Sequence, residues 1–225
     1  MKALILAAGR GERMRPLTDA TPKPLLMVGG KPLIVWVIER LKRAGVADLV
    51  VNVSHLADQI ERELGDGAKF GVRISYSFER EALETAGGIA WALPLLADRP
   101  FLVVNSDVYS NYDFADLKER AQSLSATRPA HLVLVDNPQH HPQGDFGLRD
   151  GTVTATGTRL TFSGIGAYHP ALFAGIARGE KARLAAQLAA PIAEGRVTGE
   201  HFRGEWSDVG TPQRLAELDV RLRAV

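Results

Sequence analysis

The feature that most constrains this chain is the alternation of short apolar runs with helical periods up to Val135. Lys2 to Ala8 is a continuous apolar run that ends in glycine, which is typical of a strand buried on both faces. Pro32 to Ala44 repeats apolar residues at helical spacing, and Gly45 follows as a natural helix end. Because successive parallel strands need a crossover connection, this alternation predicts an α/β fold with a mainly parallel central sheet.

The remaining elements follow the same two periodicities. Further strands are expected at Asp48 to Ser54, Val72 to Ser77, Phe101 to Asn105, Ala130 to Val135 and Val197 to Phe202. Further helices are expected at His55 to Leu64, Ala86 to Leu96, Asp113 to Ser123, Ala182 to Ala193 and Pro212 to Arg223. Gly144 to Tyr168 is rich in glycine and threonine and is predicted to form a small antiparallel elaboration. Since no linker or internal repeat divides the sequence, residues 1–225 are expected to form a single domain.

Composition limits the class of protein. The 225 residues are 45% hydrophobic and 24% charged, which favours a folded globular chain over disorder. A formal charge of +1 gives no support for nucleic acid or an acidic membrane as a partner. The apolar runs are far shorter than the roughly 20 residues that span a membrane, and the absence of cysteine excludes thiolate metal sites and cysteine nucleophiles. A cytoplasmic protein with no membrane or nucleic-acid partner is therefore expected.

A loop dense in glycine and basic residues follows the first expected strand. It reads AAGRGERMRPLT from Ala7 to Thr18, and Pro22-Lys23-Pro24 comes shortly after it. Small residues let backbone amides approach a phosphate chain or a base, while arginine and lysine supply the cations that anionic oxygens require. Because open parallel sheets bind ligands where their strands end, this loop is a candidate nucleotide or phosphate site.

Two common phosphate motifs do not explain this loop. A dinucleotide fingerprint needs a third glycine where Met14 stands, and a helix where Arg15-Pro16 interrupts the pattern. A P-loop needs glycine and lysine followed by serine or threonine, which the loop lacks. For the two glycines alone, the alternative is an ordinary turn with surface cations.

Two aspartates stand at the boundaries of expected elements. Asp107 follows the buried run Phe101 to Asn105, and Asp208 precedes the last expected helix. An acid that follows a parallel strand lies at the edge of the sheet where ligands bind. Each aspartate could instead be only a turn former or a helix cap, and the two can meet only if the sheet brings them together. His140 and His141 are adjacent on a loop rich in proline and glutamine, where solvent exposure is expected rather than metal binding.

Taken together, the glycine-rich loop and the Pro-Leu-Thr and Pro-Lys-Pro segments after it resemble the signature of the sugar-1-phosphate nucleotidyltransferases. The resemblance covers nearly the whole chain and implies a Rossmann-like three-layer sandwich. It implies that Arg13 and Lys23 are the catalytic residues that neutralise the phosphates. The nucleotide-binding residues that it implies are Ala7, Ala8, Gly9, Gly11, Glu12, Arg13, Lys23 and Gly88. The remaining implied residues are Asn105 and Gly144 for the sugar substrate, and Asp107 and Asp208 for Mg²⁺.

The sequence departs from the family pattern in three places. Glu12 stands where the family usually has threonine, so its negative charge must be kept away from the phosphates or bridged by a cation. No clear match to the glutamine that reads uracil is found near Ser77 to Arg80, and the segment Ala155 to Gly157 lacks the acid with which hexose-specific members bind sugar hydroxyls.

Gly88 lies in a Thr-Ala-Gly-Gly segment that resembles the family's nucleotide site. The alternative for this segment is that Thr85 simply caps a helix.

The resemblance implies a reaction between a nucleoside triphosphate and a sugar 1-phosphate. The short chain and the segments Asn52 to Leu56 and Trp206 to Pro212 resemble the branch of the family whose members join GTP to mannose 1-phosphate or UTP to N-acetylmuramate α-1-phosphate. Of these two reactions, the second, in peptidoglycan recycling, is favoured. In N-acetylmuramate the sugar O3 is an ether oxygen and has no proton to donate. A carboxylate near Thr156 is therefore not needed to accept a hydrogen bond from it. Guanylyl transfer to mannose 1-phosphate, or to another sugar 1-phosphate, is the first alternative. A catalytically silent nucleotide-binding subunit is the second, and the oligomeric state is left open.

Overall fold

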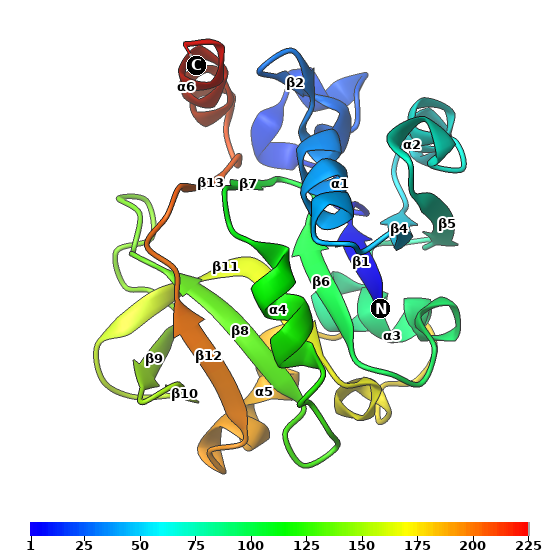
Figure 1. Ribbon diagram of the computed structural model, residues 1–225. Coiled ribbons are helices and arrows are strands. Elements are labelled where there is room, and N and C mark those ends of the chain that lie inside the picture. Colours follow the sequence, from blue (N-terminus) through cyan, green and yellow to red (C-terminus); the bar gives the residue numbers. More distant parts are fainter. Residues whose placement is uncertain (225) are drawn as a thin grey trace.

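A central sheet of nine strands runs through the part of the chain that the computed structural model describes, residues 1–224 (Figure 1). Val225, which closes the predicted domain, lies outside the described residues. The nine strands are β1 (Lys2–Leu6), β4 (Asp48–Val53), β5 (Arg73–Phe78), β6 (Phe101–Asn105), β8 (Ala130–Val135), β9 (Phe146–Arg149), β10 (Thr152–Thr154), β11 (Arg159–Tyr168) and β12 (Val197–His201). Their order across the sheet is β5-β4-β1-β6-β11-β8-β12-β10-β9.

The sheet is mixed, so the prediction of a mainly parallel sheet is wrong. Strands β5, β4, β1 and β6 are parallel to one another, as the crossover pattern predicted. Beyond them, β11 runs antiparallel to both β6 and β8, β12 is parallel to β8, and β10 is antiparallel to β12 and β9. The error arises from β11, a strand of ten residues within the segment Gly144 to Tyr168, which was expected to form only a small antiparallel elaboration. Glycine and serine at Ser163-Gly164 interrupt its apolar pattern, and its register shifts between Phe162 and Ile165.

Helices form a layer on each face of the sheet, which confirms the α/β prediction (Figure 1). One face is covered by α1 (Leu33–Arg43), α2 (Ala57–Leu64) and α4 (Phe114–Ala121), and the other by α3 (Glu84–Leu96) and α5 (Leu184–Ala193). Each layer has its own cluster of buried apolar side chains against the sheet. No helix within residues 1–224 has both the length and the apolar content that crossing a membrane would require.

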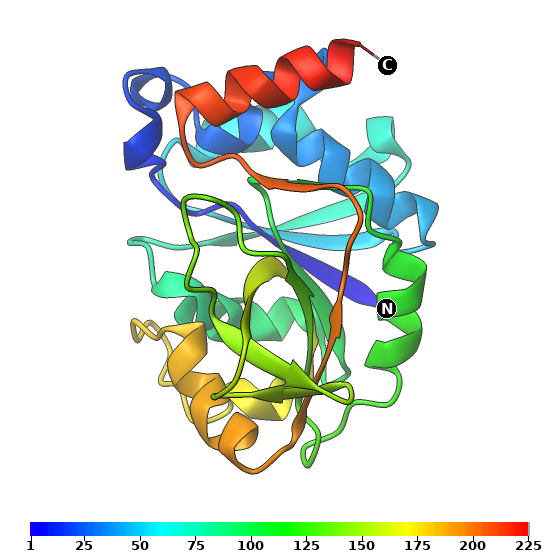
Figure 2. The ribbon, with the colours of Figure 1, turned by 90° about the vertical axis from the view of Figure 1, so that its left-hand side faces the viewer.

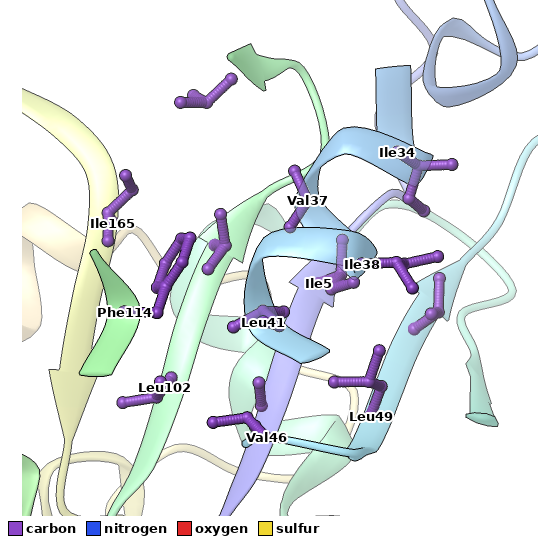
Figure 3. Packing of buried hydrophobic residues seen from close by; sticks show 14 of the residues in the cluster. Ile5, Ile34, Val37, Ile38, Leu41, Val46, Leu49, Leu102, Phe114 and Ile165 are labelled. Carbon is purple, nitrogen blue, oxygen red and sulfur yellow. The ribbon is translucent and has the colours of Figure 1, made fainter. Parts of the chain in front are cut away.

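Helix α1 shows how the apolar spacing of the sequence becomes packing. Ile34, Ile38 and Leu41 recur at helical spacing and are completely buried. Figure 3 shows them turned toward the sheet, where Ile5 of β1 and Leu49 of β4 belong to the same cluster. Because this face is apolar, burying it fixes the helix on the sheet and leaves the ends of β1 and β4 in defined positions.

The last segment of the chain packs against residues that follow β1 and β6. The short strands are β2 (Met27–Val28), β3 (Lys31–Pro32), β7 (Val108–Ser110) and β13 (Trp206–Asp208), and the last helix is α6 (Pro212–Arg223). Strand β13 pairs antiparallel with β7, and α6 then lies against β2, as Figure 2 shows. A small apolar cluster joins Met14, Val28, Tyr109 and Leu218 there. The residues that follow β6 are thereby held beside the residues that precede α6.

Candidate active site

A cavity of about 850 Å³ opens at the carboxyl ends of the four parallel strands β1, β4, β5 and β6. Side chains at such strand ends converge, because parallel strands all point to the same edge of the sheet. Nine of the predicted site residues line this cavity: Ala7, Ala8, Gly9, Gly11, Glu12, Arg13, Lys23, Asn105 and Asp107. The three that do not line it are Gly88, Gly144 and Asp208.

The glycine-rich loop is shaped by Gly11. Its φ of +64° lies in the left-handed region, and a Cβ there would come 3.0 Å from the Thr18 side chain and 3.2 Å from the Lys23 side chain. The Gly11 carbonyl accepts hydrogen bonds from the Met14 N–H at 2.8 Å and from the Thr18 hydroxyl at 2.9 Å. Only glycine therefore fits at this position, where the chain turns back over the end of β1.

Lys23 and Asp107 form an ion pair inside the cavity. The Lys23 ammonium donates to Oδ2 of Asp107, and the two side chains are 11% and 30% exposed. Asp107 is placed by β6, which ends two residues earlier, and Lys23 by a short 3₁₀ helix after the glycine-rich loop. A lysine held this way presents a fixed positive charge to anionic oxygens that enter the cavity.

Asp208 comes close to Asp107 along the backbone, but its carboxylate is bound elsewhere. Strand pairing sets Asp208 opposite Val108, and the Val209 N–H donates to the Asp107 carbonyl at 2.9 Å. Both carboxylate oxygens of Asp208 accept hydrogen bonds from Nη1 of Arg214, each at 2.8 Å. Nε2 of His140 also lies 3.0 Å from the same carboxylate. The pairing of β13 with β7 therefore brings the two predicted metal ligands close together along the backbone. The Asp107 carboxylate is paired with Lys23, and the Asp208 carboxylate with Arg214 and His140.

The two predicted glycines outside the cavity lining have different surroundings. Gly88 is buried directly behind the wall, where a Cβ would lie 2.6 Å from the Glu79 carboxylate and 2.9 Å from the Asn52 amide nitrogen. Gly144 has a φ of +59° and packs against Asn137, beneath β11. Gly88 therefore supports the cavity wall, whereas Gly144 is a structural turn in this conformation. His140 and His141 are each 41% exposed, as expected of the loop, yet each contacts a carboxylate.

A hydrogen-bonded chain in the cavity wall was missed by the sequence analysis. The Ala7 N–H donates to Oδ1 of Asn52 at 2.6 Å, and Nδ2 of Asn52 donates to Glu79 at 2.5 Å. The second Glu79 oxygen accepts from the Leu83 N–H at 3.0 Å. Burial raises the pKa of Glu79 above its ordinary value, and this effect outweighs the hydrogen bonds from Leu83 and Asn52, which lower the pKa. The available signal was a polar residue at or just after the end of each strand, the same signal that picked out Asp107.

Glu79 lies in the region where the sequence analysis looked for a base-reading glutamine. Its carboxylate is buried and lines the cavity, together with Asn52. Lys181, from the segment before α5, adds a cation to the same cavity and was not predicted. These residues are far apart in sequence and converge only because β4, β5 and α3 lie next to one another.

A second polar network ties the residues after β7 to strand β12. The Tyr112 hydroxyl donates to Glu200 at 2.5 Å, His131 lies 3.4 Å from the same carboxylate, and Arg120 lies 3.7 Å from it. Burial by itself would raise the pKa of Glu200, but the hydrogen bonds from His131 and Tyr112 and the nearby positive charge bring it below the ordinary value. This network joins the chain that follows Asp107 to the strand that leads to β13.

Replacing Glu200 with glutamine is expected to lower the free energy of unfolding by about 1–2 kcal/mol at pH 7. Because the folded pKa of Glu200 lies below its ordinary value of 4.5, its stabilising contribution is complete above pH 4.5 and is lost as the pH falls further. The difference between the native chain and the variant should therefore shrink below pH 4.5. Urea unfolding measured from pH 7 down to the acid limit of the fold tests this; a difference that stays constant would contradict it.

Comparison with known proteins agrees with this fold. The sequence model of the nucleotidyl transferase family matches residues 2–154, and the chain belongs to this family. The chain is 55% identical to the N-acetylmuramate alpha-1-phosphate uridylyltransferase of Neisseria meningitidis, over 98% of this chain and 97% of the relative. These matches confirm the resemblance to sugar-1-phosphate nucleotidyltransferases that the motifs indicated.

More distant relatives belong to the same class. The chain is 32% identical to the mannose-1-phosphate guanylyltransferase catalytic subunit beta of Danio rerio, over 95% of this chain, and it spans 62% of that protein's length. A solved structure described as a putative glucose-1-phosphate thymidylyltransferase from Bacillus anthracis superposes with a TM-score of 0.86. It covers 100% of this chain and 96% of the other, at 22% identity, and so supports the fold alone.

Proposed function

We propose that residues 1–225 form one nucleotidyltransferase domain that joins UTP to N-acetylmuramate α-1-phosphate and releases pyrophosphate. The observation that carries the reaction class is the cavity in which the glycine-rich loop faces the Lys23–Asp107 pair. The choice of substrates is supported by the 55% identity to the Neisseria uridylyltransferase over nearly the full length of both chains. A cytoplasmic location and a role in peptidoglycan recycling follow from these substrates.

The proposed reaction needs no nucleophile from the protein. An oxygen of the sugar phosphate attacks the α-phosphorus of UTP, a new P–O bond forms, and the bond to the bridging oxygen breaks as pyrophosphate leaves. The protein therefore acts by positioning and by neutralising charge. Backbone amides from Ala7 to Gly11 hold the nucleotide, and Lys23 and Arg13 compensate the charge on the phosphates. Asn105 lines the cavity at the end of β6. In this proposal its side chain contacts the sugar of the sugar 1-phosphate.

Asp107 and Asp208 would hold Mg²⁺ in this proposal. They offer two hard carboxylates, one at the end of β13 and one immediately before its partner strand β7. The described residues contain no group of three or more acidic or histidine side chains that could complete a metal site. That set suits an ion whose other ligands are phosphate oxygens and water. When bound by these two carboxylates, Mg²⁺ would supply positive charge that stabilises the charge developing on the phosphates.

A panel of the four NTPs against the 1-phosphates of N-acetylmuramate, glucosamine, glucose and mannose tests the proposed substrates. Pyrophosphate release is expected to show the highest kcat/KM for UTP with N-acetylmuramate α-1-phosphate. A higher value for GTP with mannose 1-phosphate would replace the proposal with the guanylyltransferase alternative. Binding of nucleotide without turnover of any pair would identify a catalytically silent subunit.

Replacing Gly88 with alanine is expected to raise the KM for UTP by about tenfold, because the new methyl group forces Glu79 and Asn52 out of the cavity wall. Steady-state kinetics with varied UTP at a saturating concentration of the sugar phosphate gives this value. Gly175 provides the matched control, since a Cβ there meets nothing within 4 Å, and its alanine variant should keep the native KM. Equal effects of the two substitutions would show that Gly88 has no special role.

A further inference from the structure

Arg214 is hydrogen-bonded to the carboxylate of Asp208, which is one of the two proposed metal ligands. Its Nη1 donates to both oxygens of Asp208 at 2.8 Å, and its side chain is only 16% exposed. Nη1 also contacts Nε2 of His140, which reaches the same carboxylate from the loop before β9. Asp208 is therefore engaged by basic side chains from two separate segments of the chain.

The stability of helix α6 does not explain this arginine. Arg214 stands in the first turn of α6, where the helix dipole is positive and a cation is unfavourable. The first turn contains no acidic residue, and the helix is capped by Thr211, whose hydroxyl accepts from the Arg214 N–H at 3.3 Å. Asp208, which lies outside the helix, thus provides the compensating charge. A cation placed at some cost to its helix points to a function elsewhere.

Gly210 brings Arg214 next to the predicted phosphate-binding Arg13. Gly210 is buried and lines the cavity, and a Cβ there would collide with Nη2 of Arg214. The same Cβ would lie 3.5 Å from Nη2 of Arg13. Two guanidinium groups therefore converge on one glycine of the cavity wall, and one of them, that of Arg214, is bound to the carboxylate of Asp208 at the end of β13. If a metal ion took the Asp208 carboxylate, Arg214 would need another anion.

We propose that Arg214 is a phosphate-binding residue that changes partners during binding. In the nucleotide-free protein it holds Asp208; when a divalent cation takes that carboxylate, Arg214 turns to the phosphate oxygens of the NTP beside Arg13. The inference rests on the proposed function, which supplies the metal ion and the triphosphate. Guanidinium groups suit this exchange, since they stay charged and bind carboxylate and phosphate in the same forked geometry.

The exchange predicts opposite changes in two binding measurements on Arg214→Gln. Mn²⁺ alone, titrated into nucleotide-free protein and followed by the electron paramagnetic resonance signal of free Mn²⁺, should bind about fivefold more tightly, because its competitor for Asp208 is gone. UTP, titrated calorimetrically at saturating Mg²⁺, should bind about tenfold more weakly, because one phosphate contact is lost. A residue with a merely structural role would weaken both.

Arg223→Gln is the matched control, since it removes another arginine–aspartate pair from the same helix, the exposed contact to Asp219. It should change neither affinity. Unchanged or weaker Mn²⁺ binding to Arg214→Gln overturns the proposal, and so does unchanged UTP binding. The variant Asp208→Asn distinguishes a failure of the Arg214 proposal from a failure of the proposed function. If Asp208→Asn leaves Mn²⁺ binding intact, the metal site is assigned wrongly; if it abolishes binding while Arg214→Gln has no effect, the Arg214 exchange alone is wrong.

Discussion

Replacing Asp107 with asparagine is expected to lower kcat/KM for nucleotidyl transfer by about a thousandfold. The substitution keeps the shape of the side chain but removes a proposed Mg²⁺ ligand and the counter-ion of Lys23, whose side chain is 11% exposed. Lys23 would then be free to adopt other positions, so both the charge and the geometry offered to the phosphates would change. Pyrophosphate release with UTP and N-acetylmuramate α-1-phosphate, measured over a range of Mg²⁺ concentrations, checks this result.

Asp98→Asn is the matched control for Asp107→Asn. Asp98 is exposed and precedes strand β6, at the end opposite to Asp107. The same chemical change there should leave kcat/KM and its Mg²⁺ dependence as in the native chain. A loss of less than about tenfold in a well-folded Asp107→Asn protein would show that Asp107 does not act on the reacting phosphates.

Replacing Phe114 with alanine is expected to lower the free energy of unfolding by about 4 kcal/mol and the Tm by about 10 °C. Phe114 is 3% exposed and begins α4, where Figure 3 shows its ring among the labelled side chains of Leu102 and Ile165. It also meets the ring of Tyr112 edge to face, with ring centroids 5.6 Å apart. The substitution removes these contacts and leaves a cavity that the rigid sheet cannot close.

Thermal and urea unfolding of the Phe114 variant would measure this loss, with Phe78→Ala as the control. Phe78 is 48% exposed at the end of the edge strand β5, so its removal should cost about 1 kcal/mol or less. Equal losses for the two phenylalanines would contradict the packing described for α4. Tyr112, which packs on Phe114, donates a hydrogen bond to Glu200. A loss of unfolding free energy well above about 4 kcal/mol would therefore indicate that the substitution also disrupts this polar network.

Local pattern was sufficient for most elements of the fold. The predicted strands Phe101 to Asn105 and Ala130 to Val135 and the helix Pro212 to Arg223 have those bounds in the structure. Continuous apolar runs, helical spacing and the Thr211 cap are properties of neighbouring residues, so the sequence displays them directly. Strand β11 was missed as one element because its pattern is broken by glycine and serine, and because its pairing with β6 and β8 is not local.

The sequence by itself determined the glycine-rich loop, the position of Lys23 and the strand-end polar residues, because each is specified by residues that are close along the chain. Only the tertiary structure decided which of them meet. It joined Asn52 to Glu79 in the cavity wall, set Lys23 against Asp107, and turned the Asp208 carboxylate to Arg214. It also decided the mixed order of the sheet. Such contacts depend on strand order and on helix packing over long sequence separations, and no short pattern encodes them.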